Sequence, residues 1–181
     1  MRDSRSAELS PQVGTVVLTE QEIQRRVAGL ADEISQDYEG REILAVAVLK
    51  GALPFAVDLV RRLSVPAELE MLGISRYQSS GREKTVRIVR DLEEQPTGRD
   101  VLIVEDIVDT GLTLHYLTAV LRRRAPASIR TVTLLDRPEL RLADIRPDYV
   151  GFSVSEAFLV GYGLDYRERF RGLPYIAELI L

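Results

Sequence analysis

An apolar stretch that ends in carboxylates, VLIVEDIVDTGLTL at residues 101–114, constrains the fold of this chain more than any other segment. Its first four residues are apolar, which is typical of a strand covered on both faces in a parallel sheet. Glu105, Asp106 and Asp109 follow, and a Thr-Gly-x-Thr turn then leads into a helical pattern. Ligands of an open parallel sheet bind beyond the carboxyl ends of its strands. The turn is therefore a candidate binding loop.

The rest of the chain predicts strands that alternate with helices. The segment 43–51, ILAVAVLKG, is a continuous apolar run that fits a second strand buried on both faces. Thr19 and Glu22 have the spacing of a capping box, and the apolar period after them predicts a helix that ends near Gly40. We expect further strands at 67–77, 86–92, 129–137, 148–155 and 171–181, and further helices at 52–63 and 113–124. This alternation predicts an α/β fold with a central, mostly parallel twisted sheet flanked by helices.

The chain of 181 residues has the length of one domain. Residues 1–18 are expected to be an N-terminal tail that leads into a short strand, and residues 19–181 to be a single domain. The stretch from about 73 to 87 is polar, charged and contains Gly and Ser, so it fits either a mobile loop or part of a hairpin. Such segments often serve as lids over active sites, and we expect a lid here.

Composition excludes several classes of protein. The sequence has no cysteine, which excludes disulfides, thiolate metal sites and a cysteine nucleophile. The formal net charge is −4, so nucleic acid is not an expected partner. The apolar runs are too short to cross a membrane, and residues 1–12 lack the apolar core of a signal peptide. We therefore expect a cytoplasmic protein that binds neither nucleic acid nor membrane.

The turn after the first strand has the chemistry of a ribose phosphate site. Gly111 allows a sharp turn whose amides can face an anion, the following helix N-terminus adds partial positive charge, and Thr110 and Thr113 add hydroxyl donors. The loop lacks the lysine of a nucleoside triphosphatase P-loop. Because carboxylates repel a phosphate but accept from ribose hydroxyls, Glu105 and Asp106 are expected to hold a sugar diol. Helix capping alone would explain one Asp or Thr, but not the whole pattern.

These residues resemble the phosphoribosyl pyrophosphate (PRPP) signature of the type I phosphoribosyltransferases. VLKGALPF at 48–55 resembles the pyrophosphate loop of the hypoxanthine–guanine phosphoribosyltransferases, and the segment 150–176, which contains LVGYGLDY, resembles their purine-binding end. The resemblance runs from about residue 15 to the C-terminus. It implies the type I phosphoribosyltransferase fold, with a small hood formed by the N- and C-terminal segments and a purine-binding part at about 150–181.

The resemblance implies a purine salvage enzyme. The reaction would transfer the phosphoribosyl group of PRPP to N9 of hypoxanthine or guanine, giving IMP or GMP and pyrophosphate. Asp109 would lie near N7 of the purine as the general base. Glu105 and Asp106 would hold the ribose hydroxyls, and the 5-phosphate would be bound by Thr110, Gly111, Leu112 and Thr113.

The resemblance also implies residues that bind the pyrophosphate, the purine and the metal ion. Leu49, Lys50 and Gly51 would form the pyrophosphate loop, in which the Leu49–Lys50 peptide is often cis, and Arg171 would reach the pyrophosphate. The purine would be bound by Arg137, Phe158, Leu159 and Asp165. A Mg²⁺ cofactor would be held by Glu105, Asp106 and Asp165, because Mg²⁺ binds through carboxylates and substrate phosphates. Arg76 and Tyr77 would belong to the lid.

Three positions depart from the family pattern. Arg137 replaces a lysine that donates to the purine 6-oxo group, Arg76 replaces a lid serine, and Ala157 replaces a lysine before the stacking ring. Arginine still donates but is planar and longer, so a xanthine-preferring transferase remains an alternative. A second alternative is a PRPP-binding, pyrimidine-operon RNA regulator with uracil phosphoribosyltransferase activity. An adenine-preferring transferase and an inactive ribose phosphate sensor fit the residues less well. The apolar segment 52–60 favours a homo-oligomer, either a dimer or a tetramer.

Overall fold

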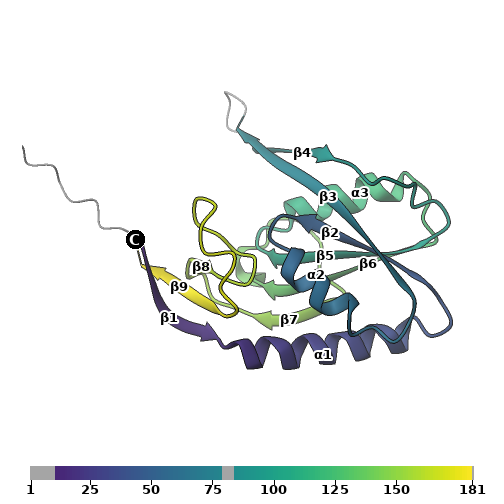
Figure 1. Ribbon diagram of the computed structural model, residues 1–181. Helices are drawn as coiled ribbons and strands as arrows, with labels where there is room; N and C mark the ends of the chain where they lie inside the picture. Colours follow the sequence, from purple (N-terminus) through teal and green to yellow (C-terminus); the bar gives the residue numbers. More distant parts are fainter. Residues whose placement is uncertain (1–10, 79–83, 181) are drawn as a thin grey trace, which may run out of the picture.

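The computed structural model, which describes residues 11–78 and 84–180, contains a large sheet and a small one (Figure 1). The large sheet has six strands in the order β4-β3-β2-β5-β6-β7, and the small sheet has the order β1-β9-β8. The strands are β1 (Gln12–Leu18), β2 (Ile43–Leu49), β3 (Ala67–Gln78), β4 (Lys84–Arg90), β5 (Asp100–Val108), β6 (Ser128–Asp136), β7 (Tyr149–Ser153), β8 (Leu159–Val160) and β9 (Ile176–Ile180). The helices are α1 (Glu20–Asp37), α2 (Leu53–Val60) and α3 (Leu112–Arg122), with a short 3₁₀ turn at Pro138–Leu140.

The large sheet is mostly parallel, as expected from the sequence. β3, β2, β5, β6 and β7 pair in parallel, and only the edge strand β4 pairs antiparallel, with β3. Parallel neighbours bring their carboxyl ends to one edge of a sheet. The loops that follow β2, β5 and β6 therefore lie close together. The predicted fold class is confirmed.

Strand β2 shows why this sheet is buried on both faces. Ile43, Ala45 and Ala47 pack with residues of α1 and α2, whereas the alternate residues Leu44 and Val46 pack with residues of α3. Both sets are fully buried, and Figure 1 shows α3 on the opposite side of the sheet from α1 and α2. Burying one Leu, Ile or Val side chain contributes roughly 1.5–3 kcal/mol. A continuous apolar strand is the sequence pattern that this arrangement requires.

Helix α1 begins and ends as its sequence predicts. Thr19 Oγ1 accepts from Glu22 N at 3.3 Å, and Glu22 Oε2 accepts from Thr19 N at 2.8 Å, which completes the capping box. The helix ends at Asp37, and Gly40 follows with a φ of +73°. Within the described ranges, no helix has both the length and the apolarity needed to cross a bilayer.

The polar stretch at about 73–87 lies mainly in a hairpin, which was one of its two predicted forms. β3 and β4 pair antiparallel from Gly73↔Arg90 to Gln78↔Lys84. Arg76 and Tyr77 lie on β3, but their side chains are outside the described part of the structure, as are residues 79–83.

The two ends of the chain meet in the small sheet. Residues 12–18, which were expected within an N-terminal tail, form β1 and pair antiparallel with β9. β9 also pairs with the two-residue strand β8, whereas β7 belongs to the large sheet. The small sheet lies to one side of the large sheet in Figure 1, and the long turn between β8 and β9 lies between them.

An arginine of α1 closes the free edge of the large sheet. Arg26 donates from Nη2 to the carbonyl of Val150 at 2.7 Å and from Nε to the carbonyl of Gly151 at 3.0 Å. Both acceptors belong to β7, the last strand in the sheet order. Unpaired carbonyls of an edge strand need such partners, and the two bonds fix α1 against the sheet.

We predict that Arg26→Gln lowers the free energy of unfolding by about 2 kcal/mol, because two part-buried bonds from a charged donor are lost. Arg25→Gln removes a neighbouring exposed arginine and is expected to have little effect. Urea denaturation followed by circular dichroism measures both changes. Equal stability of the two variants would contradict the role given to Arg26.

Candidate active site

Two adjoining cavities lie beyond the carboxyl ends of the strands. The first has a volume of about 380 Å³, and the second has a volume of about 330 Å³. Both are lined by Glu105, Ile107 and Asp109, so they meet at the end of β5. The predicted site residues that line the first cavity are Leu49, Gly51, Glu105, Asp106, Asp109, Arg137, Phe158, Leu159, Asp165 and Arg171. The second is lined by Glu105, Asp109, Thr110, Gly111, Leu112 and Thr113.

The acid pair at the end of β5 packs against the loop after β2. Glu105 is only 6% exposed, and Asp106 Oδ1 accepts from the amide of Ile107 at 2.9 Å. A β-carbon built on Gly51 would lie 1.6 Å from Asp106 Oδ2. A side chain at position 51 would therefore displace the Asp106 carboxylate from its present place. The structure brings together the predicted ribose acids and the predicted pyrophosphate loop, whose Leu49–Lys50 peptide is cis, as the resemblance implied.

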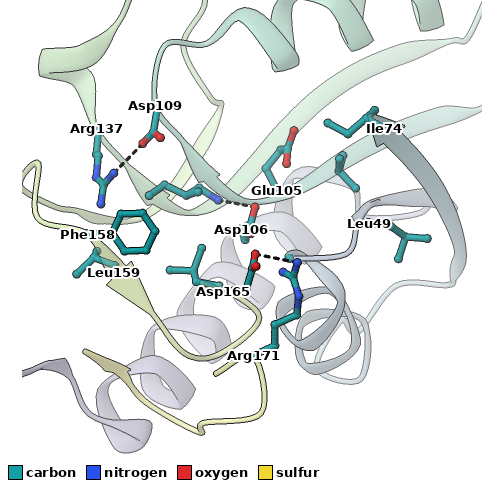
Figure 2. A pocket seen from close by; sticks show the side chains of 14 residues that line it. Leu49, Ile74, Glu105, Asp106, Asp109, Arg137, Phe158, Leu159, Asp165 and Arg171 are labelled. Atoms are coloured by element: carbon teal, nitrogen blue, oxygen red, sulfur yellow. Dashed lines mark hydrogen bonds and ion pairs between the residues drawn. The ribbon is translucent and has the colours of Figure 1, made fainter. Parts of the chain in front are cut away.

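Asp109 forms an ion pair with the arginine that departs from the family pattern. Arg137 Nη1 lies 3.3 Å from Asp109 Oδ1, and Arg137 Nη2 donates to the carbonyl of Ala157 (Figure 2). The Arg137 side chain is 11% exposed, and its Nε has no hydrogen-bond partner among the described residues. One guanidinium group thus connects β6, the loop after β5 and the turn before β8. The guanidinium also lines the first cavity, so its other N–H groups lie close to the space for a ligand.

The turn from Thr110 to Thr113 lines the second cavity with the start of α3. Gly111 caps this helix with a φ of +77°, a left-handed conformation that favours glycine. The Thr110 hydroxyl accepts from the amide of Leu112 at 3.4 Å. A turn that leads its amides into a helix N-terminus is a favourable place for an anion. These four residues therefore surround a space suited to a phosphate.

The Phe158 ring faces the first cavity from the turn before β8. Its side chain lies near Arg137 and Leu159 in Figure 2, and the residue is 48% exposed. The Tyr166 ring packs edge-on against it, with centroids 5.7 Å apart and planes at 86°. The sequence analysis did not identify Tyr166, although its place in LVGYGLDY was a usable signal. A half-exposed aromatic face held by a second ring can stack on a planar ligand.

Glu168, which the sequence analysis missed, pairs with both cations of the predicted pyrophosphate site, Lys50 and Arg171. Arg171 Nη2 lies 2.8 Å from Asp165 Oδ1 and 3.3 Å from Glu168 Oε1. Lys50 is not among the residues that line the cavities, because its Nζ lies 2.9 Å from Glu168 Oε2 and its side chain is 65% exposed. The hydrogen bonds from Lys50 and Arg171 lower the pKa of the Glu168 carboxyl.

Several apolar lining residues were also missed, because apolar side chains beside the predicted polar ones carry no signal that separates cavity wall from core. Val48, Ile74, Ile107 and Leu164 complete the first cavity, and Val86, Val108, Leu114 and Leu142 complete the second. Ile74 and Val86 come from the two strands of the β3–β4 hairpin, so the hairpin supplies part of the wall of both cavities.

The carboxylates fit a magnesium ion that takes its other ligands from a substrate. Glu105, Asp106 and Asp165 offer the hard oxygen donors that Mg²⁺ prefers, and all three line the first cavity. Among the described residues, no group of three or more carboxylate or imidazole side chains is close enough to hold a metal ion by itself. Mg²⁺ is typically bound through one or two carboxylates plus substrate phosphates, which is the arrangement that these residues permit.

Comparisons with known proteins agree with this site. The phosphoribosyl transferase domain family matches residues 15–167. The hypoxanthine-guanine phosphoribosyltransferase of Bacillus subtilis (strain 168) is 48% identical over 165 residues, 91% of this chain and 92% of the relative. The protein of the same name from Mycobacterium tuberculosis (strain ATCC 25618 / H37Rv) is 45% identical, over 97% of this chain and 91% of its own. The crystal structure of a Staphylococcus aureus hypoxanthine phosphoribosyltransferase has a TM-score of 0.89 and 42% identity, covering 93% of this chain and 92% of that chain.

The residues that the family model matches include the whole lining of the second cavity and that of the first except Arg171, and the alignments cover 91–92% of the length of these relatives. The chain therefore belongs to the phosphoribosyl transferase family, in its hypoxanthine-guanine phosphoribosyltransferase branch.

Proposed function

We propose that this protein is a purine salvage enzyme that transfers the phosphoribosyl group of PRPP to N9 of hypoxanthine or guanine. The products are IMP or GMP and pyrophosphate. One observation supports this function above the others: an acid pair, of which Glu105 is buried, an anion-binding turn and a half-exposed aromatic ring line two adjoining cavities. The two relatives named hypoxanthine-guanine phosphoribosyltransferase, at 45% and 48% identity, support the same reaction.

The sugar phosphate lies across the meeting point of the cavities in this proposal. The turn from Thr110 to Thr113 binds the 5-phosphate through its amides and hydroxyls, and Glu105 and Asp106 accept from the ribose hydroxyls. This leaves the anomeric carbon facing the first cavity. That carbon becomes oxocarbenium-like as its bond to pyrophosphate stretches, as in glycoside chemistry. Nearby carboxylates stabilise the developing positive charge.

The leaving pyrophosphate is stabilised from the other wall. The backbone of Leu49, Lys50 and Gly51 donates to its oxygens, and Arg171 adds a full positive charge. Mg²⁺, held by Glu105, Asp106 or Asp165 together with the phosphates, would neutralise negative charge on the leaving group. The proposal also assigns Lys50 to the pyrophosphate, which requires its side chain to leave Glu168.

The purine lies against Phe158, with the backbone of Leu159 at its edge. Asp109 accepts the proton on N7, which makes N9 a better nucleophile. Arg137 holds the Asp109 carboxylate through Nη1, and its guanidinium, which lines the first cavity, donates to the 6-oxo group. A donor at this place favours a carbonyl over an amino group, so we expect 6-oxopurines rather than adenine.

The proposal extends to location and assembly. We place the enzyme in the cytoplasm, where charged sugar phosphates are retained. We assign a lid function to the β3–β4 hairpin, with Arg76 and Tyr77, because Ile74 and Val86 already line the cavities. We expect a dimer or a tetramer, because Leu53 and Val57 are 38% and 37% exposed on one helix, α2.

The direct test is a spectrophotometric assay with PRPP, Mg²⁺ and one base at a time. We expect nucleotide formation with hypoxanthine and guanine, a lower rate with xanthine, and none with adenine or uracil. Chelation of the metal with EDTA should abolish the reaction, and Mg²⁺ should restore it. Activity with uracil alone would overturn the proposal, and a preference for xanthine would correct its substrate.

We predict that Asp109→Asn lowers kcat by about 10²–10⁴-fold, the usual contribution of general base catalysis. The KM for PRPP should change little, because the amide keeps the size of the side chain. Asp32→Asn, on the exposed face of α1, is the matched control and should leave kcat unchanged. Steady-state kinetics measure both constants, and an equal loss in kcat and PRPP binding would refute the base role.

Arg137 should affect the purine more than PRPP. We expect Arg137→Met to raise the KM for hypoxanthine and to lower kcat by about tenfold or more, because a charged hydrogen bond to Asp109 is lost. Arg137→Lys should recover most of the hypoxanthine activity, because lysine keeps the positive charge. It should also alter the ratio of guanine to xanthine rates, because lysine lacks the planar guanidinium with its fixed set of N–H donors. Unchanged base selectivity in both variants would contradict this assignment.

A further inference from the structure

The loop after β6 supports the phosphate-binding turn from behind. The carbonyl of Thr110 accepts from the amides of Leu142 and Ala143, at 2.9 Å and 3.0 Å. Ile145 packs on the same turn, since its Cγ2 would lie 2.9 Å from a β-carbon on Gly111. The conformation of the predicted 5-phosphate site thus depends on residues that are 30 or so positions later in the chain.

One arginine fixes this supporting loop. Arg141 Nη2 donates to Asp136 Oδ1 at the end of β6, and the two side chains are only 15% and 12% exposed. Arg141 also touches the turn, because a β-carbon on Gly111 would lie 2.9 Å from its Cδ and 3.2 Å from its Nη1. Its Nη1 is buried and has no hydrogen-bond partner within the described residues. Leaving a charged donor buried and unpaired is unfavourable, so this group calls for a functional explanation.

Arg141 lies behind the wall of the phosphate cavity rather than inside it. Gly111 lines the second cavity, whereas Arg141, Asp136 and Ile145 line a separate cavity of about 480 Å³. The guanidinium therefore acts on a bound phosphate through the Gly111 backbone. Asp136 pairs with Nη2, whereas Nη1 is the guanidinium nitrogen nearest to Gly111, so the ion pair has its positive end toward the turn and adds to the field of the α3 N-terminus.

We propose that Arg141, held by Asp136, is a positioning residue for the 5-phosphate of PRPP. It fixes the turn from Thr110 to Thr113 in its anion-binding form and places the positive end of its ion pair with Asp136 next to Gly111. This inference rests on the proposed function for the identity of the substrate. It concerns the sugar phosphate alone, since Arg141 lines neither of the two site cavities.

The experiment compares Arg141→Met, Arg141→Lys and the matched control Arg146→Met, an exposed arginine of the same loop. We expect Arg141→Met to raise the KM for PRPP by about tenfold or more, the effect of losing a charged buried interaction. The KM for hypoxanthine should stay within about twofold, and Arg141→Lys should recover part of the PRPP affinity. The control should behave as the wild type. Thermal unfolding of each variant shows that the comparison is made on folded protein.

A purely structural role would lower kcat and the affinities for both substrates together, without rescue by lysine, and this outcome overturns the inference. Calorimetric titration with ribose 5-phosphate tests the inference about Arg141 separately from the proposed function. If the wild type binds ribose 5-phosphate but transfers nothing to purines, the proposed function has failed. Weaker binding in Arg141→Met and partial recovery in Arg141→Lys would still support the inference, and equal affinities in all variants would overturn it.

Discussion

The site depends on the close approach of three loops at Gly51. A β-carbon at this position would lie 1.6 Å from Asp106 Oδ2, and one on Gly163 would lie 2.0 Å from the Gly51 carbonyl oxygen. The Gly163 distance is to backbone and excludes a side chain, and a side chain at position 51 would displace the Asp106 carboxylate, so the loop after β2, the end of β5 and the turn after β8 are in close contact. In the proposed reaction these loops hold the pyrophosphate, the ribose and the purine end. Their contact therefore sets the distance between the reacting groups, where a displacement of about 1 Å can cost about 10²-fold in rate.

The charges around the cavities are arranged before any ligand arrives. Asp109 is paired with Arg137, and Asp165 is paired with Arg171, at the two sides of the first cavity (Figure 2). Fixed pairs of this kind orient donors without reorganisation during the reaction, which is how electrostatic catalysis gains its effect. The exposed pair between Lys50 and Glu168 differs, because water screens both groups and the pair is weak. Lys50 can exchange this partner for an anionic ligand at little cost.

Much of the fold could be predicted from the sequence, because the signals were local. The apolar run of β2 and the capping box at Thr19 predicted their elements directly, since burial on both faces and a helix start leave a pattern in consecutive residues. The cluster around Glu168 could not be predicted in the same way. The position of Glu168 depends on a turn in which Arg167 and Glu168 have φ values of +51° and +63°. Non-glycine residues seldom adopt this conformation, so the sequence contains no signal that predicts it. The support of Gly111 by Arg141 is also invisible in sequence, because it joins two loops through tertiary packing alone.

A crystal structure of the protein with IMP bound tests the central claim most directly. The claim is that the amides of the turn at 110–113 and the acid pair of β5 grip one ribose phosphate between them. The account predicts the phosphate on that turn, the ribose hydroxyls within hydrogen-bond distance of Glu105 and Asp106, and the purine ring stacked on Phe158. A nucleotide bound with its phosphate away from the turn, or with its ribose facing away from both acids, would contradict it.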